Sequence, residues 1–165
     1  MKTKKGFTLI ELLIVIALLG ALAIGLLATI DPFEQLKKGR DTSTRNTVSE
    51  FYNANLRFYA IKGVFPWGTD PTADGVNNLT GSVIATLVSA GELKQRFSDL
   101  AGTGNLSKIF LNSTGPESMT VCFRPESKAF KVDPNTVYDV SGGTSLTDCQ
   151  SVAGGTNPNC YFCIQ

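Results

Sequence analysis

The stretch KKGFTLIELLIVIALLGALAIG, Lys4–Gly25, decides how the rest of the chain must be arranged. The apolar run that starts here continues to Ile30, and the 24 residues from Phe7 to Ile30 carry a single charge, on Glu11. A helix of this length spans about 36 Å, enough to cross a bilayer with some tilt. A carboxylate at membrane depth costs roughly 3 kcal/mol unless it is compensated, so Glu11 needs a partner.

Beyond residue 31 the chain has the composition of an ordinary soluble domain. The sequence holds 15 basic and 14 acidic side chains, and residues 7–165 hold 12 and 14 of them. A nucleic-acid-binding domain needs a basic face, so this balance predicts no specific nucleic-acid partner. One basic cluster, interleaved with Asp41, is interpreted as solvated or facing lipid headgroups; it consists of Lys37, Lys38, Arg40 and Arg45.

Two simple interpretations of the amino-terminal segment leave features unexplained. A cleavable secretory signal would be cut after the small residues around Ala23, but the apolar run continues for seven more residues and Glu11 would lie inside the signal. A plain membrane anchor with its amino end in the cytoplasm fits the length. It gives Glu11 no role.

The hexapeptide Gly6-Phe7-Thr8-Leu9-Ile10-Glu11 behind a lysine-rich leader closely resembles the class III signal of type IV pilins and type II secretion pseudopilins. In that pattern a basic leader ends in Gly, Phe or Met follows, and Glu is the fifth mature residue before about twenty apolar residues. The resemblance implies that prepilin peptidase cuts the Gly6–Phe7 bond on the cytoplasmic side and methylates the new amine. The apolar segment is then retained.

The new amine at Phe7 is a natural counter-charge for Glu11. Residues four apart meet on one helix face, so the two could pair within one chain. In a bundle of identical chains, Glu11 of one chain can instead meet Phe7 of its neighbour. The resemblance favours this intermolecular pairing, which makes Glu11 an assembly residue. The alternatives are an unpaired Glu11 that reaches the membrane interface and a protonated one.

Residues 31–62 are expected to continue the helix as an amphipathic segment. Asp31 suits the helix cap and Pro32 the first helical turn, while Gly63 ends the pattern. An apolar stripe at steps of three and four predicts a face that docks on a head domain; it consists of Val48, Phe51, Tyr52, Leu56 and Tyr59.

Residues 63–165 are predicted to form a globular head, with Phe65 and Trp67 as core anchors. We expect a short helix at Ser82–Ala90 and strands at Lys108–Leu111, Met119–Arg124, Ala129–Val132 and Cys160–Ile164. The second and third strands would be joined by a hairpin loop, and residues 135–159 are mostly loop. The predicted fold is α+β: a long helix with a membrane-spanning first half, packed on a small antiparallel sheet. The predicted parts are a leader (1–6), an apolar helix (7–30), its continuation (31–62) and the head.

All four cysteines lie in the head, at Cys122, Cys149, Cys160 and Cys163. An even number beyond a membrane anchor favours disulfides in an exported domain. The alternative is a four-thiolate zinc site, since the chain has no histidine. Three pairings are open; we favour Cys149–Cys160 closing the glycine-rich loop and Cys122–Cys163 tying the last strand into the sheet.

The sequence offers no catalytic constellation. The absence of histidine removes the commonest general base and the usual nucleophile pairings. No phosphate-binding loop is present. Asp139 and Asp148 flank a loop that could hold calcium, but the dense acidic spacing of such loops is missing, and a solvated loop is favoured. We therefore predict no enzyme, no cofactor and no metal.

The function that these features predict is a structural subunit that polymerises into a type IV pilus or pseudopilus. Its partners would be further copies of itself, prepilin peptidase, the inner-membrane pilus assembly machinery and, before assembly, membrane lipid. It would be a single-pass precursor in the cytoplasmic membrane and then part of an extracellular filament serving adhesion, motility, DNA uptake or secretion. The alternatives are a membrane-anchored adhesin that never polymerises and a minor pilin that primes or tips the filament.

Overall fold

The computed structural model describes residues 6–29, 31–68, 81–113, 115–139, 142, 149 and 160–165. The chain divides into two compact units, Met1–Gln35 and Leu36–Gln165. The fold of each unit follows from the pattern of its apolar residues.

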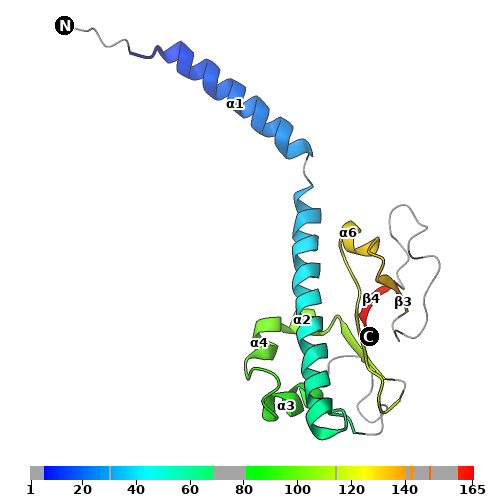
Figure 1. The fold of residues 1–165 in the computed structure, drawn as a ribbon. Helices are drawn as coiled ribbons and strands as arrows, with labels where there is room; N and C mark the ends of the chain where they lie inside the picture. The colour runs from blue at the N-terminus through cyan, green and yellow to red at the C-terminus, as the bar shows by residue number, and fades with distance from the viewer. Residues whose placement is uncertain are drawn as a thin grey trace. The chain divides into compact units, whose positions relative to one another are not determined.

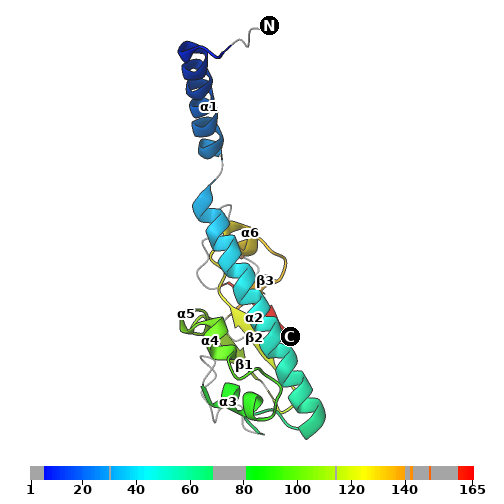
Figure 2. The same ribbon diagram turned by 90° about the vertical axis from the view of Figure 1, so that its left-hand side faces the viewer.

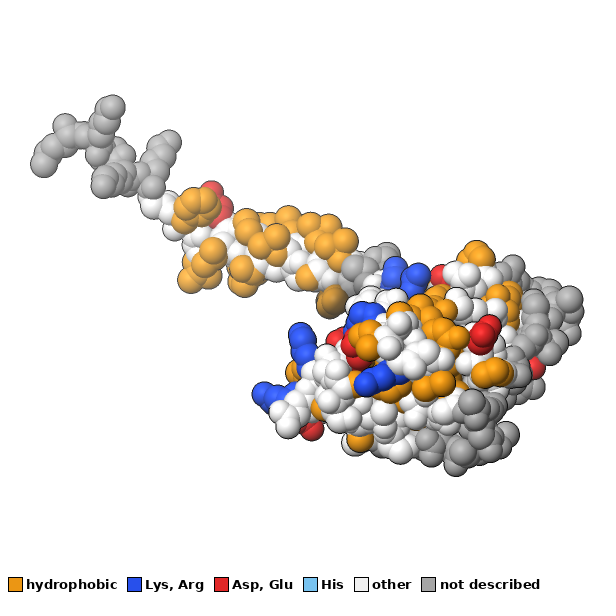
Figure 3. Space-filling model, turned by 60° about the horizontal axis from the view of Figure 1, so that its bottom comes forward, with side chains coloured by type: hydrophobic (Ala, Val, Ile, Leu, Met, Phe, Trp, Pro, Cys, Tyr) orange, Lys and Arg blue, Asp and Glu red, His pale blue; other side chains and the backbone are white. Residues whose placement is uncertain are grey.

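The first unit is built on α1, Leu9–Thr29. Its apolar side chains point in all directions and none has a protein core to pack against: the large ones from Phe7 to Leu27 are 46–86 % exposed. On the face drawn in Figure 3, hydrophobic side chains cover this helix. Leu9–Leu27, with a mean hydropathy of 2.8, is the one stretch within the described residues that is long and apolar enough to cross a membrane. A helix that is apolar all round needs lipid or other helices around it.

The second helix, α2, comprises Pro32–Lys62. Asp31 caps it, because its Oδ1 accepts hydrogen bonds from the backbone N–H groups of Phe33 and Glu34, both at 3.2 Å. Pro32 occupies the first helical position, where its missing N–H costs nothing. Gly63, at φ +72°, ends the helix in the left-handed region. The predicted long helix is therefore present as α1 and α2, and Asp31 starts its second part.

The buried face of α2 is more polar than the apolar stripe suggested. Val48, Phe51 and Ala54 are fully buried, and Leu56 is 40 % exposed. Three polar residues complete the buried face, namely Asp41, Thr44 and Asn55. The spacing of apolar residues does not predict the burial of these three polar side chains.

Four strands form one antiparallel sheet with the order β1-β2-β4-β3. They are β1 (Ile109–Asn112), β2 (Thr120–Phe123), β3 (Thr136–Tyr138) and β4 (Tyr161–Ile164). Figures 1 and 2 together show α2 lying along one side of this sheet. The predicted α+β fold, a long amino-terminal helix with a small antiparallel sheet, is confirmed.

The core of the head lies where α2, the sheet and α3 (Gly81–Ser89) meet. Phe51 from α2, Leu87 from α3 and Phe123 from β2 are all fully buried there. The expected anchors are also part of it: the Phe65 and Trp67 rings stack with centroids 4.7 Å apart.

One predicted strand is wrong. Residues 128–131 form a short helix, α6 (Lys128–Lys131), instead of a strand paired with β2. Ser127 starts this helix, because its Oγ accepts a hydrogen bond from the N–H of Phe130 at 3.3 Å. The partners of β2 are β1 and β4. β3 and two short helices, α4 (Phe97–Ala101) and α5 (Thr103–Leu106), were not predicted from the sequence.

Candidate processing and assembly site

Glu11 lies in the first turn of α1, where it forms a reciprocal cap with Thr8. Oε2 of Glu11 accepts hydrogen bonds from the backbone N–H of Thr8 at 2.8 Å and from its hydroxyl at 2.6 Å. In return, the Thr8 hydroxyl accepts a hydrogen bond from the N–H of Glu11 at 3.3 Å. This arrangement is a capping box, in which a Thr and a Glu three residues later satisfy each other's backbone groups.

Thr8 is thus a functional candidate that the sequence analysis missed. The signal was present in the spacing Thr8-x-x-Glu11 ahead of an apolar run, which is typical of a capping box. The two hydrogen bonds from Thr8 end on Oε2 and leave Oε1 for a further donor. Glu11 is therefore oriented within its own chain while one carboxylate oxygen stays available.

The expected cleavage point lies just outside the helix. Gly6, Phe7 and Thr8 precede α1, which begins at Leu9. Gly6 is exposed, and the Phe7 side chain is 86 % exposed. A peptidase that acts on extended backbone needs no helix to unwind here.

The head contains both disulfides in the pairs that the sequence analysis favoured. Cys122 of β2 and Cys163 of β4 are directly opposite in the strand register, with Cα atoms 4.1 Å apart, and are bonded to each other. Cys149 is bonded to Cys160. All four cysteines are therefore in disulfides, which leaves no thiolate for a zinc site.

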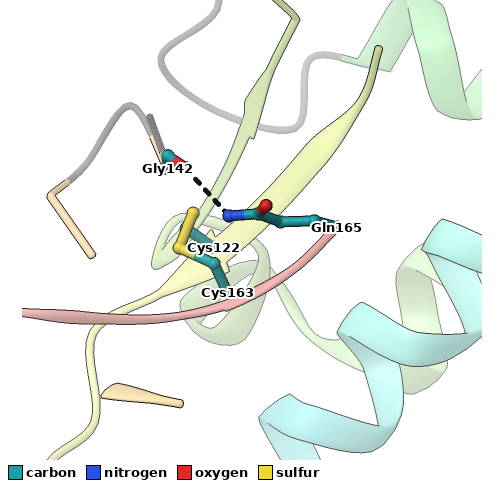
Figure 4. The surroundings of a disulfide bond; sticks show 4 residues. All are labelled: Cys122, Gly142, Cys163 and Gln165. Carbon is teal, nitrogen blue, oxygen red and sulfur yellow. Dashed lines mark hydrogen bonds between the residues drawn. A yellow bond between two sulfur atoms is a disulfide. The ribbon is translucent and has the colours of Figure 1, made fainter. Parts of the chain in front are cut away.

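Figure 4 shows Gly142 and Gln165 beside the Cys122–Cys163 bond. The Gln165 side chain donates a hydrogen bond from Nε2 to the backbone oxygen of Gly142 at 3.0 Å. Gly142 has φ +69°, and a Cβ there would lie 2.3 Å from Cγ2 of Thr120 and 3.1 Å from Sγ of Cys122. Only glycine fits this position, for both its backbone conformation and its space.

Asp41, which lies between the residues of the basic cluster in the sequence, is buried, whereas Lys38, Arg40 and Arg45 are exposed. Its side chain is 3 % exposed. The carboxylate accepts hydrogen bonds from the backbone N–H of Glu126 (3.0 and 3.1 Å) and of Ser127 (2.7 Å), and from the Ser127 hydroxyl (2.6 Å). Asp41 thus fixes the segment between β2 and α6 to α2.

In the described part of the chain, no three His, Cys, Asp or Glu side chains gather as a metal site. Asp148, one of the two residues considered for calcium, lies outside the described residues. The backbone oxygen of the other, Asp139, accepts a turn hydrogen bond from the N–H of Gly142 at 3.0 Å.

Comparison with known proteins identifies the amino-terminal segment. Residues 1–27 match the family described as the prokaryotic N-terminal methylation motif. This motif is the class III signal of type IV pilins and pseudopilins. No curated protein and no solved structure matches the chain.

The match and the helix together indicate how the amino-terminal segment is processed and held. The chain carries the processing signal of a type IV pilin or pseudopilin substrate of prepilin peptidase, and its apolar helix indicates a membrane-anchored precursor. The motif points to a structural, pilin-type protein and away from an enzyme.

Proposed function

We propose that this protein is a subunit that polymerises into a type IV pilus or a pseudopilus. In this proposal, prepilin peptidase removes residues 1–6 and methylates Phe7. Residues 7–30 then form the filament core, residues 31–62 continue the helix, and residues 63–165 form the head at the filament surface. The membrane-held precursor is extracted by the inner-membrane assembly machinery into an extracellular filament.

The observation that carries the proposal is the unpacked apolar surface of α1 within a class III signal. Fourteen large apolar side chains from Phe7 to Leu27 have no core to bury them. Burial of such a side chain from water is worth roughly 1.5–3 kcal/mol, so the helix cannot leave the bilayer into water alone. A sheath of identical helices is an apolar surround that a soluble filament can provide.

Glu11 would set the register of that sheath. Both hydrogen bonds from Thr8 end on Oε2, so Oε1 can accept a hydrogen bond from the methylated amine of Phe7 of a neighbouring chain. In apolar surroundings an ion pair of this kind offsets part of the cost of two isolated charges. Thr8 then acts as a positioning residue, because it holds the carboxylate in one orientation.

Mass spectrometry of the mature amino terminus separates this function from its alternatives. We expect N-methyl-Phe7 as the first residue. A chain that retains residues 1–6 would indicate a non-polymerising anchor such as an adhesin, and a chain that begins at Ile24 would indicate an ordinary secretory signal. Either result would refute the proposal.

Variants of the capping box test the assembly step. Glu11→Ala should still be cleaved and held in the membrane, but filaments seen by electron microscopy should fall at least about tenfold, as expected for a lost apolar-phase ion pair. Glu34→Ala removes a carboxylate outside the membrane-spanning helix and serves as the matched control. Thr8→Val should reduce assembly less than Glu11→Ala does, and Thr8→Ser should restore it. Normal filament yield from Glu11→Ala would contradict the proposed pairing. If the wild-type chain is cleaved but contributes to few filaments, the alternative of a minor pilin that primes or tips the filament would be favoured.

A further inference from the structure

A groove of about 550 Å³ opens on the head beside the start of α2. Four basic side chains from distant parts of the sequence line it: Lys37 of α2, Lys108 just before β1, Arg124 just after β2 and Lys131 of α6. Among the described residues, Glu126 is the one acidic residue in its lining. The overall charge of the chain does not reveal this concentration, because the fold creates it.

Glu126 is already engaged by basic side chains. Lys108 donates a hydrogen bond from Nζ to Oε1 of Glu126, and Arg40 lies 3.4 Å from Oε2. The hydrogen bond from Lys108 and the charges of Lys108, Arg40 and Lys37 lower the pKa of Glu126, against the opposing effect of partial burial. The carboxylate is therefore a fixed anion that offsets Lys108 and Arg40.

Arg124 and Lys131 have no acidic partner of this kind. Neither forms an ion pair with any residue in the described ranges, although both line the groove. A planar guanidinium and a flexible ammonium in one groove are suited to the oxygens of a phosphate group. The groove therefore keeps positive charge available for an anionic ligand.

Two aromatic rings also line the groove. Phe110 of β1 and Tyr161 of β4 meet edge to face, with centroids 5.5 Å apart, and each keeps part of its surface exposed. Aromatic rings beside positive charges form the combination with which proteins bind single-stranded nucleic acid: the charges follow the backbone and the rings stack on bases. A flat lipid surface would use projecting basic residues and would gain nothing from recessed rings.

We propose that this groove binds single-stranded nucleic acid. Arg124 and Lys131 contact neighbouring phosphates, and the ring pair of Phe110 and Tyr161 stacks on a base. A duplex keeps its bases stacked inside and offers none to the ring pair, so it binds more weakly. The proposal concerns the head alone and does not depend on polymerisation.

The test uses the full mature chain in zwitterionic detergent and a fluorescently labelled oligothymidylate, with binding followed by anisotropy at several salt concentrations. The double variant Arg124→Gln/Lys131→Gln should lose at least about tenfold in affinity, and its log–log salt slope should decrease by about 1.4, since each phosphate contact on a single strand contributes about 0.7. Lys62→Gln/Arg96→Gln removes two exposed basic side chains outside the groove lining and should leave both values unchanged.

Stacking is tested separately with Tyr161→Leu, which should weaken binding while it leaves the salt slope in place. Unfolding curves confirm that each variant is folded. The proposal is overturned if the wild type does not bind at physiological salt, or if both double variants lose affinity equally. It is also overturned if duplex DNA, an acidic polysaccharide or phosphatidylglycerol nanodiscs bind as tightly as the single strand.

Discussion

At the scale of single residues, Glu11 and Asp41 are two carboxylates that differ in how far the sequence predicts their roles. Glu11 stood out because it interrupts an apolar run, and its spacing from Gly6 and Phe7 identified the motif. Asp41 lay among lysines and arginines and looked solvated. Its burial depends on backbone donors 85 and 86 residues away, at Glu126 and Ser127. No local pattern in the sequence contains that information.

Asp41 should contribute strongly to the stability of the head. Asp41→Ala leaves the buried N–H of Ser127 and its neighbour without an acceptor, so we expect the free energy of unfolding to fall by about 3 kcal/mol. Urea unfolding followed by the fluorescence of Trp67, the one tryptophan of the chain, measures this.

Glu50→Ala is the matched control for that experiment. Glu50 is an exposed acid on the same helix, and its loss should change the free energy of unfolding by less than about 0.5 kcal/mol. Similar losses for the two variants would mean that the hydrogen bonds of Asp41 add nothing beyond its charge.

At the scale of elements, predictions from local signals succeeded and those that needed a distant partner failed. The end of α2 at Gly63 and the helix before Gly91 were both marked by glycines that have positive φ in the structure. The segment around Phe130 alternates like a strand, but Ser127 caps it as α6, and Asp41 holds Ser127 in place. The short strand β3 pairs with β4 in an irregular register, which no periodicity reveals.

The contacts of Glu126 with Lys108 and Arg40 predict a pH dependence of head stability. The pKa of Glu126 is lowered from 4.5, so the folded state favours its ionised form. The resulting stabilisation is fully present above about pH 4.5 and is lost as the pH falls through the lower pKa of the folded state. Wild-type protein should therefore lose stability as the pH falls below about 4.5, which urea unfolding at a series of acidic pH values measures.

Glu126→Gln should lack this component of the acid response. Its stability should be lower than that of the wild type at pH 7, and the difference should shrink as the pH falls. Glu117→Gln alters an exposed acid and should leave the wild-type pH profile unchanged. A constant difference between wild type and Glu126→Gln at all pH values would contradict the assignment.

At the scale of the whole molecule, the folds of the two units are determined in different ways, one by local sequence and the other by non-local contacts. The amino-terminal unit, with its apolar α1, is specified by composition and a short motif, so the sequence predicted its fold and its processing signal. The head is specified by non-local contacts, and only its general class and several elements were predictable. The groove lined by Lys37, Lys108, Arg124 and Lys131 is the clearest case, because residues spread over 95 positions meet in it.

The disulfide that closes the longer loop should stabilise the head more than the other one does. Cys122 and Cys163 are 41 residues apart and Cys149 and Cys160 are 11 apart. From loop entropy alone, replacing the first pair by serine should cost about 4 kcal/mol and replacing the second about 3 kcal/mol. Urea unfolding of the two double-serine variants measures both; a larger loss for the second pair would contradict the loop-closure account.

Both bridges also impose an order on biogenesis. Each needs a cysteine from the segment around β4, Cys160 or Cys163, and neither can close until that segment has reached an oxidising compartment. The helices from α2 to α6 and the first three strands precede β4 in the chain. Until β4 follows them, they have no disulfide to stabilise them. Under the proposed function, both disulfides would therefore close only after β4 has been exported, while α1 still holds the subunit at the membrane.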